Sequence, residues 1–191
     1  KELVVEQSLN TSYGGSWKTT LNTDLFVAVW KAIFAKGLHL QQDFTVKVDA
    51  DSLFAPDRLF YVLDAYSKEE QRTAMYLNSC PWCLVKLIGP IEIFSREAMK
   101  QYSGNMDRCH REVPHHNISE DVFLENCGRL LRIRAVDPPR RLLRPDWKIQ
   151  NIDHKFCSEG WAAFHPYKSP AALLRCYETT YALTETQVKA P

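Results

Sequence analysis

The stretch Phe44-Thr-Val-Lys-Val-Asp-Ala-Asp-Ser-Leu-Phe-Ala-Pro56 decides the fold that the sequence predicts. Its first five residues alternate apolar and polar side chains, a pattern typical of a β-strand with one buried face. Asp49 and Asp51 follow directly, and Pro56 stands where the first turn of a helix tolerates proline. The stretch therefore predicts an interior strand, a loop carrying two carboxylates and then a helix.

Similar patterns along the chain predict helices that alternate with strands. Asn22 or Thr23 caps, and Gly37 ends, a helix whose apolar residues recur at helical spacing. Further expected helices cover 56–66 and 95–102 and begin at Ser119 and Ser169, with 103–118 as loop; expected strands cover 74–77, 84–88, 91–94 and 132–136. This alternation predicts one α/β domain over residues 1–191, with a sheet that is mixed because some connections are short.

The composition indicates a globular domain and gives little sign of a charged partner. A chain of 191 residues, 45% hydrophobic and 12% aromatic, can fill a sizeable core. Its net charge of +1 gives no reason to expect binding to nucleic acid or to an anionic membrane. No apolar run reaches the roughly 20 residues of a membrane span, so we expect no membrane contact from this chain itself. Because the chain begins with Lys1, we expect a cut or processed end, with any anchor or targeting segment upstream.

Cysteines and glycosylation sequons favour a secretory compartment. Six cysteines form an even set, which allows three disulfides and 15 connectivities. The triplets Asn10-Thr-Ser and Asn117-Ile-Ser are acceptor patterns for N-glycosylation. Together they predict that the chain lies in the lumen of the secretory pathway or is secreted.

The two aspartates after the first strand are candidate metal ligands. Ligands in open α/β sheets sit outside the carboxyl ends of the strands, where Asp49 and Asp51 lie. Paired carboxylates suit hard cations such as Mg²⁺ or Mn²⁺. The alternative is a solvated turn in which an aspartate caps the next helix.

Four motifs in chain order resemble a known enzyme group. They are Asp49-Ala-Asp51, Gly89-Pro-Ile-Glu-Ile-Phe-Ser-Arg96, Glu120-Asp-Val-Phe-Leu-Glu-Asn-Cys127 and Phe164-His-Pro166. Together, over about residues 22–180, they resemble nucleotide-sugar glycosyltransferases with the GT-A fold. The segment from Ser119 is most similar to Fringe-like and β-1,3-galactosyltransferase-type enzymes. The resemblance implies a Rossmann-like GT-A layered sheet, mixed but mostly parallel, with helices on both faces.

The resemblance also implies roles for individual residues. Asp51 would bind a divalent cation, Mn²⁺ or Mg²⁺, that bridges the donor diphosphate, and Asp49 would contact the donor ribose or share that cation. His165 would be the third metal ligand, which suits Mn²⁺ because it accepts imidazole. Gly89 would let the backbone approach the donor sugar or the acceptor, because glycine has no Cβ.

Two acidic residues after Ser119 are candidates for the catalytic base. The helix dipole alone explains acids in a first turn. The apolar side of this helix, however, is opposite, which leaves Asp121 free to face a cleft. By the resemblance, Asp121 would deprotonate the acceptor hydroxyl in an inverting transfer, and Glu120 is the second choice.

The implied activity is sugar transfer from a nucleoside diphosphate sugar, expected to be a UDP-sugar, to a hydroxyl of a glycan or protein in the Golgi or endoplasmic reticulum. The fold normally opens with a base-binding strand well upstream of the aspartates. Only 48 residues precede Asp49, and Tyr13-Gly-Gly-Ser-Trp17 does not read as that unit, so we expect this strand to be missing. The alternative is a non-catalytic secreted interaction domain on the same scaffold.

The motif Cys80-Pro-Trp-Cys83 allows rival interpretations. It could be a redox pair, or half of a zinc site completed by Cys109, His110, His115 or His116. Redox motifs of the thioredoxin type sit where a strand meets a helix, whereas strand-like residues follow here. Structural disulfides are the simpler interpretation.

Overall fold

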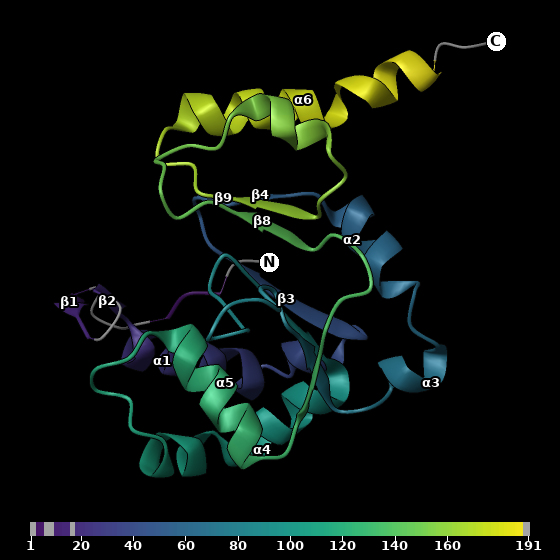
Figure 1. The fold of residues 1–191 in the computed structure, drawn as a ribbon. Coiled ribbons are helices and arrows are strands. Elements are labelled where there is room, and N and C mark those ends of the chain that lie inside the picture. Colours follow the sequence, from purple (N-terminus) through teal and green to yellow (C-terminus); the bar gives the residue numbers. More distant parts are fainter. Residues whose placement is uncertain (1–2, 6–9, 16–17, 189–191) are drawn as a thin grey trace.

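The computed structural model describes residues 3–5, 10–15 and 18–188, which form helices packed around three sheets (Figure 1). The strands are β1 Ser12–Gly14, β2 Thr19–Leu21, β3 Phe44–Val48, β4 Leu53–Phe54, β5 Met75–Leu77, β6 Ile91–Ser95, β7 Arg134–Val136, β8 Leu143–Pro145 and β9 Ala163–His165. The α-helices are α1 Thr23–Ala35, α2 Pro56–Leu63, α3 Lys68–Gln71, α4 Arg96–Glu112, α5 Glu120–Leu130 and α6 Pro170–Val188, and the short 3₁₀ turns are η1 Leu38–Leu40 and η2 His154–Ser158. This order confirms the α/β class.

The strand directions correct one expectation. The central sheet has the order β3-β6-β5-β7, and a second sheet has the order β4-β9-β8. β6 pairs antiparallel with both β3 and β5, whereas β5–β7 and β8–β9 are parallel. The predicted mixed sheet is confirmed, but a mostly parallel one is wrong. Segment 78–90 holds no helix that could carry the chain back over a face of the sheet, so β6 returns antiparallel to β5.

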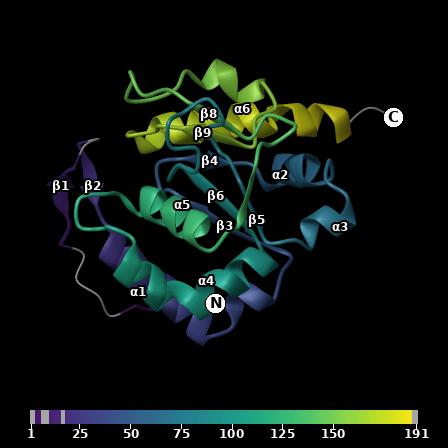
Figure 2. The same cartoon turned by 60° about the horizontal axis from the view of Figure 1, so that its bottom comes forward.

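Both faces of the central sheet are covered, as predicted. Tyr76 of β5 and Phe94 of β6 face a core shared with α1, α4 and α5. The alternate residues, such as Met75 and Ile93, face a second core that includes α2, β8 and β9. Figure 2 shows the resulting layers, with α1 and α4 on one side of the central strands and the second sheet and α6 on the other. The alternation of side chains along β5 and β6 therefore separates these two cores, and a third lies between the second sheet and α6.

Strand β3 corrects another expectation, because it is an edge strand and not an interior one. All five of its residues are partly exposed, and β6 is its neighbour on one side. After β3 the chain turns, with the Ser52 N–H donating to the Asp49 carbonyl over 3.0 Å, and enters the second sheet as β4. The two aspartates thus occupy the link between the two sheets.

Expected boundaries fail at two other places. Residues 103–112, expected as loop, continue α4, which buries a sparse stripe of Met99, Tyr102, Met106 and Cys109 on an otherwise polar helix. Residues 84–88, expected as a strand, form an irregular segment. There the Glu125 carboxylate accepts the N–H groups of Lys86 and Leu87 at 2.8 and 3.1 Å. A side chain on α5 therefore satisfies backbone groups that would otherwise need a strand partner.

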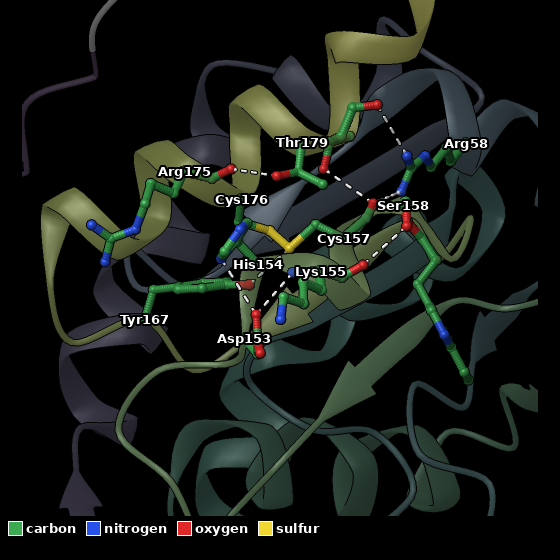
Figure 3. Close-up of a disulfide and its surroundings, with 12 residues drawn as sticks. Arg58, Asp153, His154, Lys155, Cys157, Ser158, Tyr167, Arg175, Cys176 and Thr179 are labelled. Atoms are coloured by element: carbon green, nitrogen blue, oxygen red, sulfur yellow. Dashed lines mark hydrogen bonds and ion pairs between the residues drawn. A yellow bond between two sulfur atoms is a disulfide. The ribbon is translucent and has the colours of Figure 1, made fainter.

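Three disulfides cross-link the described residues: Cys80–Cys83, Cys109–Cys127 and Cys157–Cys176. The second joins α4 to α5 and the third joins η2 to α6 (Figure 3). Beside the third, the Arg58 guanidinium donates to the carbonyls of Cys157, Trp161 and Thr180. Disulfides of this kind persist in oxidising compartments, which agrees with the secretory prediction. Within the described residues, no helix combines the length and apolarity that a membrane crossing requires.

The segment before α1 forms a small hairpin. β1 pairs antiparallel with β2, and this pair joins neither of the other sheets. Among the described residues, no strand upstream of β3 enters the central sheet. Ser16 and Trp17 of the Tyr13–Trp17 stretch lie outside the described residues.

Two helical glycines give a matched test of the packing. A Cβ at Gly128 of α5 would lie 2.7 Å from the Tyr102 hydroxyl and 3.0 Å from the Tyr76 ring, whereas a Cβ at Gly104 of α4 would meet nothing within 4 Å. We expect Gly128→Ala to lower the free energy of unfolding by about 1–3 kcal/mol through overpacking. Gly104→Ala should raise it by about 1 kcal/mol through helix propensity. Urea unfolding measures both, and a stabilised Gly128→Ala would contradict this packing.

Candidate functional site

A cavity of 760 Å³ lies where the two sheets, the start of α5 and the hairpin meet. Asp49 and Asp51 reach it from the β3–β4 turn, and His165 reaches it from the end of β9. All six residues predicted from the sequence line this one cavity: Asp49, Asp51, Gly89, Glu120, Asp121 and His165. Residues from four separate segments are thus brought together.

The backbone around Asp51 fixes this side of the cavity. The Asp51 carbonyl accepts the Tyr167 N–H over 2.8 Å, just beyond β9. Leu53 of β4 pairs with Phe164 of β9. The segment that carries His165 is therefore tied to the aspartates by backbone hydrogen bonds on both sides of Ser52.

Asp49, Asp51 and His165 form a group that could hold a metal ion. One potential ligand atom from each lies within 4.8 Å of the others, and His165 Nε2 is 3.4 Å from Asp51 Oδ2. Burial lowers the pKa of His165, which favours the neutral imidazole that a metal requires. Burial would raise the pKa of Asp51, but the hydrogen bond from Lys168 and the charges of His165 and Lys168 outweigh it and hold this pKa below its ordinary value.

The donor set fits a divalent cation. His165 Nδ1 is buried and has no hydrogen-bond partner among the described residues. The ring nitrogen that faces Asp51 is Nε2, and together with the two carboxylates it offers one nitrogen and at least two oxygen donors. Such a mixture suits Mn²⁺, and its carboxylate part suits Mg²⁺.

Lys47 contacts this group through Asp49 and was not among the site residues predicted from the sequence. Its ammonium is 2.8 Å from Asp49 Oδ1, 3.1 Å from Glu92 Oε1 and 3.2 Å from Glu120 Oε2, and it donates to the Gly89 carbonyl over 3.1 Å. Lys47 and Glu92 are directly paired across β3 and β6. Only Glu92 carries a recognisable signal, since it interrupts the apolar run Ile91–Phe94, whereas Lys47 occupies a polar position of the alternating strand.

The electrostatics of this cluster favour a fixed, charged lysine. Burial would lower the pKa of Lys47, but Glu92, Glu120 and Asp49 outweigh it and raise that pKa. Burial raises the pKa of Glu92 well above its ordinary value, and the nearby Glu120 raises it further. The lysine thus supplies the positive charge that these buried carboxyl groups need.

Glu120 is poorly placed to act as the catalytic base. It is 2% exposed, and its carboxylate accepts from Trp30 Nε1 over 3.3 Å as well as from Lys47. Burial also raises its pKa. Through these contacts Glu120 joins α5 to α1 and β3.

Asp121 is better placed for contact with a ligand. Its Oδ2 accepts the Gly89 N–H over 3.0 Å, and its Oδ1 accepts from the Ser119 hydroxyl and from the Val122 N–H. A Cβ on Gly89 would lie 3.1 Å from Asp49 Oδ2 and 3.7 Å from Asp121 Oδ2. The absence of a side chain at Gly89 therefore lets its backbone lie close to both carboxylates.

The cysteine alternatives are corrected by the disulfides. Cys80 pairs with Cys83 and Cys109 pairs with Cys127, so none of these thiols is free to bind zinc. No helix starts at Cys80–Cys83, unlike a thioredoxin-type redox motif. Two histidines of the zinc alternative, His110 at the end of α4 and His115 after it, lie beside Asp24 of α1 and are considered below.

Removing the Lys47 charge should be costly. Lys47→Met leaves two buried carboxyl groups without their cation, so we expect the free energy of unfolding to fall by about 3–5 kcal/mol. The matched control is Lys31→Met, since Lys31 pairs with Asp107 at 2.6 Å on an exposed surface. There we expect a change of about 0–1 kcal/mol. Urea unfolding of both variants at neutral pH makes the comparison.

The Lys47→Met deficit should also depend on pH. The pKa of Glu92 is raised in the folded state, so acid protonates this group in the folded protein before the unfolded chain. The loss of unfolding free energy caused by Lys47→Met should therefore be complete at pH values above the folded-state pKa of Glu92. It should shrink as the pH falls through that pKa. A deficit that grows on mild acidification would contradict this assignment of charges.

Comparison with known proteins does not assign this chain to a family. No protein-family model matches the chain, and no curated protein matches it. What the cavity does must therefore be inferred from its own side chains.

Proposed function

We propose that the chain is a GT-A-type glycosyltransferase domain that transfers a sugar from a nucleoside diphosphate sugar, expected to be a UDP-sugar, to a hydroxyl group of a glycan or protein. One observation carries the proposal: the Asp49, Asp51 and His165 group shares a 760 Å³ cavity with Asp121. Its volume lies in the range of small-molecule sites. The disulfides suit the lumen of the Golgi or endoplasmic reticulum.

Asp49, Asp51 and His165 would hold the divalent cation. Bound Mn²⁺ or Mg²⁺ would neutralise the donor diphosphate and so favour departure of the nucleoside diphosphate. Lys168 is about half exposed, lines the same cavity and pairs with Asp51. Its ammonium can add to the charge that receives the diphosphate.

Asp121 would act on the acceptor. The Gly89 N–H and the Ser119 hydroxyl hold its carboxylate in one orientation. Asp121 lines the cavity, so an acceptor hydroxyl bound there could reach its carboxylate. Asp121 would remove the hydroxyl proton as the oxygen attacks the sugar, which makes the transfer inverting.

The hairpin offers a way to hold the nucleotide base without a strand of the central sheet. Tyr13 of β1 is 75% exposed and lines the cavity. An exposed aromatic ring at a cavity wall can stack on a nucleobase. This contact would replace the expected base-binding strand.

The metal site is tested by Asp51→Asn. This change removes a charged oxygen ligand, so we expect the Mn²⁺-dependent part of UDP binding to disappear. Calorimetric titration with UDP, with and without Mn²⁺, measures this binding.

The matched control is Asp43→Asn. Asp43 precedes β3 at the end opposite the cavity and pairs with Arg96 at 2.9 Å. Asp43→Asn should leave UDP affinity unchanged. An unaltered Mn²⁺-dependent affinity for UDP in Asp51→Asn would rule out the proposed metal site.

The base is tested by Asp121→Asn. An amide keeps an oxygen for the Gly89 N–H but cannot take a proton, so UDP affinity should persist. Release of UDP from UDP-sugars, with the acceptor or with water, should fall by at least about 100-fold. Retained turnover would assign the base to another group.

One observation favours the alternative, a non-catalytic interaction domain. Both aspartates already have ammonium partners, Lys47 for Asp49 and Lys168 for Asp51. A domain that binds no donor would use these pairs only for stability. The UDP titration separates the two, because that domain would give no signal with any nucleotide, whether or not Mn²⁺ is present.

A further inference from the structure

A second group of metal-binding side chains lies between α1 and α4. Asp24, in the first turn of α1, is 3.0 Å from His110 Nε2 and 3.7 Å from His115 Nε2. One potential ligand atom from each of the three lies within 4.8 Å of the others. Figure 2 shows α1 and α4 side by side, and the ion pair of Lys31 with Asp107 continues the same seam. None of the three residues lines the 760 Å³ cavity.

The hydrogen bond of His115 to the backbone suits a metal ligand. His115 Nδ1 is 3.0 Å from the Val113 carbonyl, and a carbonyl oxygen can only accept. In the neutral ring, Nδ1 therefore carries the hydrogen and Nε2, the atom that faces Asp24, has a free lone pair. A backbone carbonyl that holds the other ring nitrogen is the usual partner of a metal-bound histidine.

We propose that Asp24, His110 and His115 form a second metal site, selective for Zn²⁺ or a similar imidazole-binding transition metal over Mg²⁺. The cation would replace the hydrogen shared by His110 Nε2 and Asp24, leaving the His110 ring neutral with its hydrogen on Nδ1. Two imidazoles and one carboxylate would bind it, and water would complete a tetrahedral set. This site is independent of the proposed transferase activity.

The donor atoms distinguish this site from the cavity. The cavity offers two carboxylates and one imidazole, whereas the second group offers two imidazoles and one carboxylate. Nitrogen-rich sites bind Zn²⁺ more tightly than Mn²⁺, and carboxylate-rich sites suit Mg²⁺ and Mn²⁺. Zn²⁺ outcompetes Mn²⁺ at such sites in general, so the distinguishing property is the preference for Zn²⁺ over Mg²⁺, which should be stronger at the second group than at the cavity.

The surroundings hold the ligands in place before a metal binds. The Cys109–Cys127 disulfide fixes the residue next to His110 against α5. The His115 ring packs edge-on against Phe123, with ring centroids 6.1 Å apart, and its side chain is 10% exposed. The Thr23 hydroxyl, next to Asp24, donates to the Ile118 carbonyl over 2.9 Å. Little reorganisation is needed to bring the three ligands together.

The experiment measures Zn²⁺ binding with the cavity site disabled. Metal-free Asp51→Asn protein is titrated with Zn²⁺ by calorimetry, alone and combined with His110→Ala, His115→Ala or Asp24→Asn. We expect one equivalent to bind in the parent, at least about tenfold more tightly than in any of the three combined variants. Cobalt(II) in place of Zn²⁺ should give the visible absorption of a tetrahedral site in the parent, and a much weaker band in His110→Ala.

His154→Ala is the matched control. His154 is also a partly exposed histidine beside an aspartate, with Nδ1 3.3 Å from Asp153 Oδ1, but it has no third ligand within the described residues. Its removal should leave Zn²⁺ affinity unchanged. If His115→Ala fails to fold, His110→Gln on the helix surface decides the matter. Equal Zn²⁺ affinity in the parent and the His110 variants would overturn the proposal, as would loss of binding in His154→Ala alone.

Discussion

The buried Lys47 ammonium is the interaction on which the rest of the site depends. A buried charge is costly unless partners surround it, and here they come from three other parts of the chain: Glu92 on β6, Glu120 on α5 and the Gly89 carbonyl. None of these partners lies near Lys47 in sequence. The cluster therefore fixes the distance between the edge strand, its neighbour, the helix and the loop, and it stabilises only the arrangement that brings all of them together.

This constraint also creates the cavity. Glu120 is held inward by Lys47 and Trp30, so the next residue, Asp121, is directed towards Gly89 and the open space. Lys47 pairs with Asp49, while the backbone N–H of Tyr167, just beyond β9, donates to the Asp51 carbonyl. The buried Glu120 thus helps to position the more accessible Asp121, so the acidic pair at the start of α5 divides into a buried member and one that faces the cavity.

Local patterns predicted much of the fold, and the failures have physical reasons. The apolar spacing of α1 and the alternation of β3 depend only on near neighbours, so they could be read directly. Segment 84–88 has a strand-like composition, but Glu125 of α5 satisfies its backbone, and no local pattern contains that information. The predicted helix at 95–102 is shorter than α4, because the buried stripe of α4 is narrow and its other side chains are polar. Strand direction depends on whether a connection contains a crossover helix, which apolar spacing does not indicate.

The residues of the candidate site could be predicted from the sequence, but the pairing of their charges could not. The site's six residues were found because their order along the chain resembles one enzyme group, and the fold brings all six to one cavity. No local pattern indicates how the charges pair. Glu92 interrupts an apolar strand and Lys47 occupies a polar position of an alternating one, but only the register of β3 on β6 places them opposite each other.

The two lysines at the aspartates differ in a way that bears on how a cation could enter. Lys47 is 11% exposed and cannot leave Asp49 without also abandoning Glu92 and Glu120. Lys168 is 54% exposed, and among the described residues its ammonium has Asp51 as its partner. A long exposed side chain exchanges partners at little cost, because water solvates its charge. A cation arriving at Asp51 and His165 would therefore displace Lys168 and not Lys47, and the freed ammonium would remain at the cavity wall, where an anionic ligand could meet it. The buried lysine thus preserves the shape of the site while the exposed one can change partners.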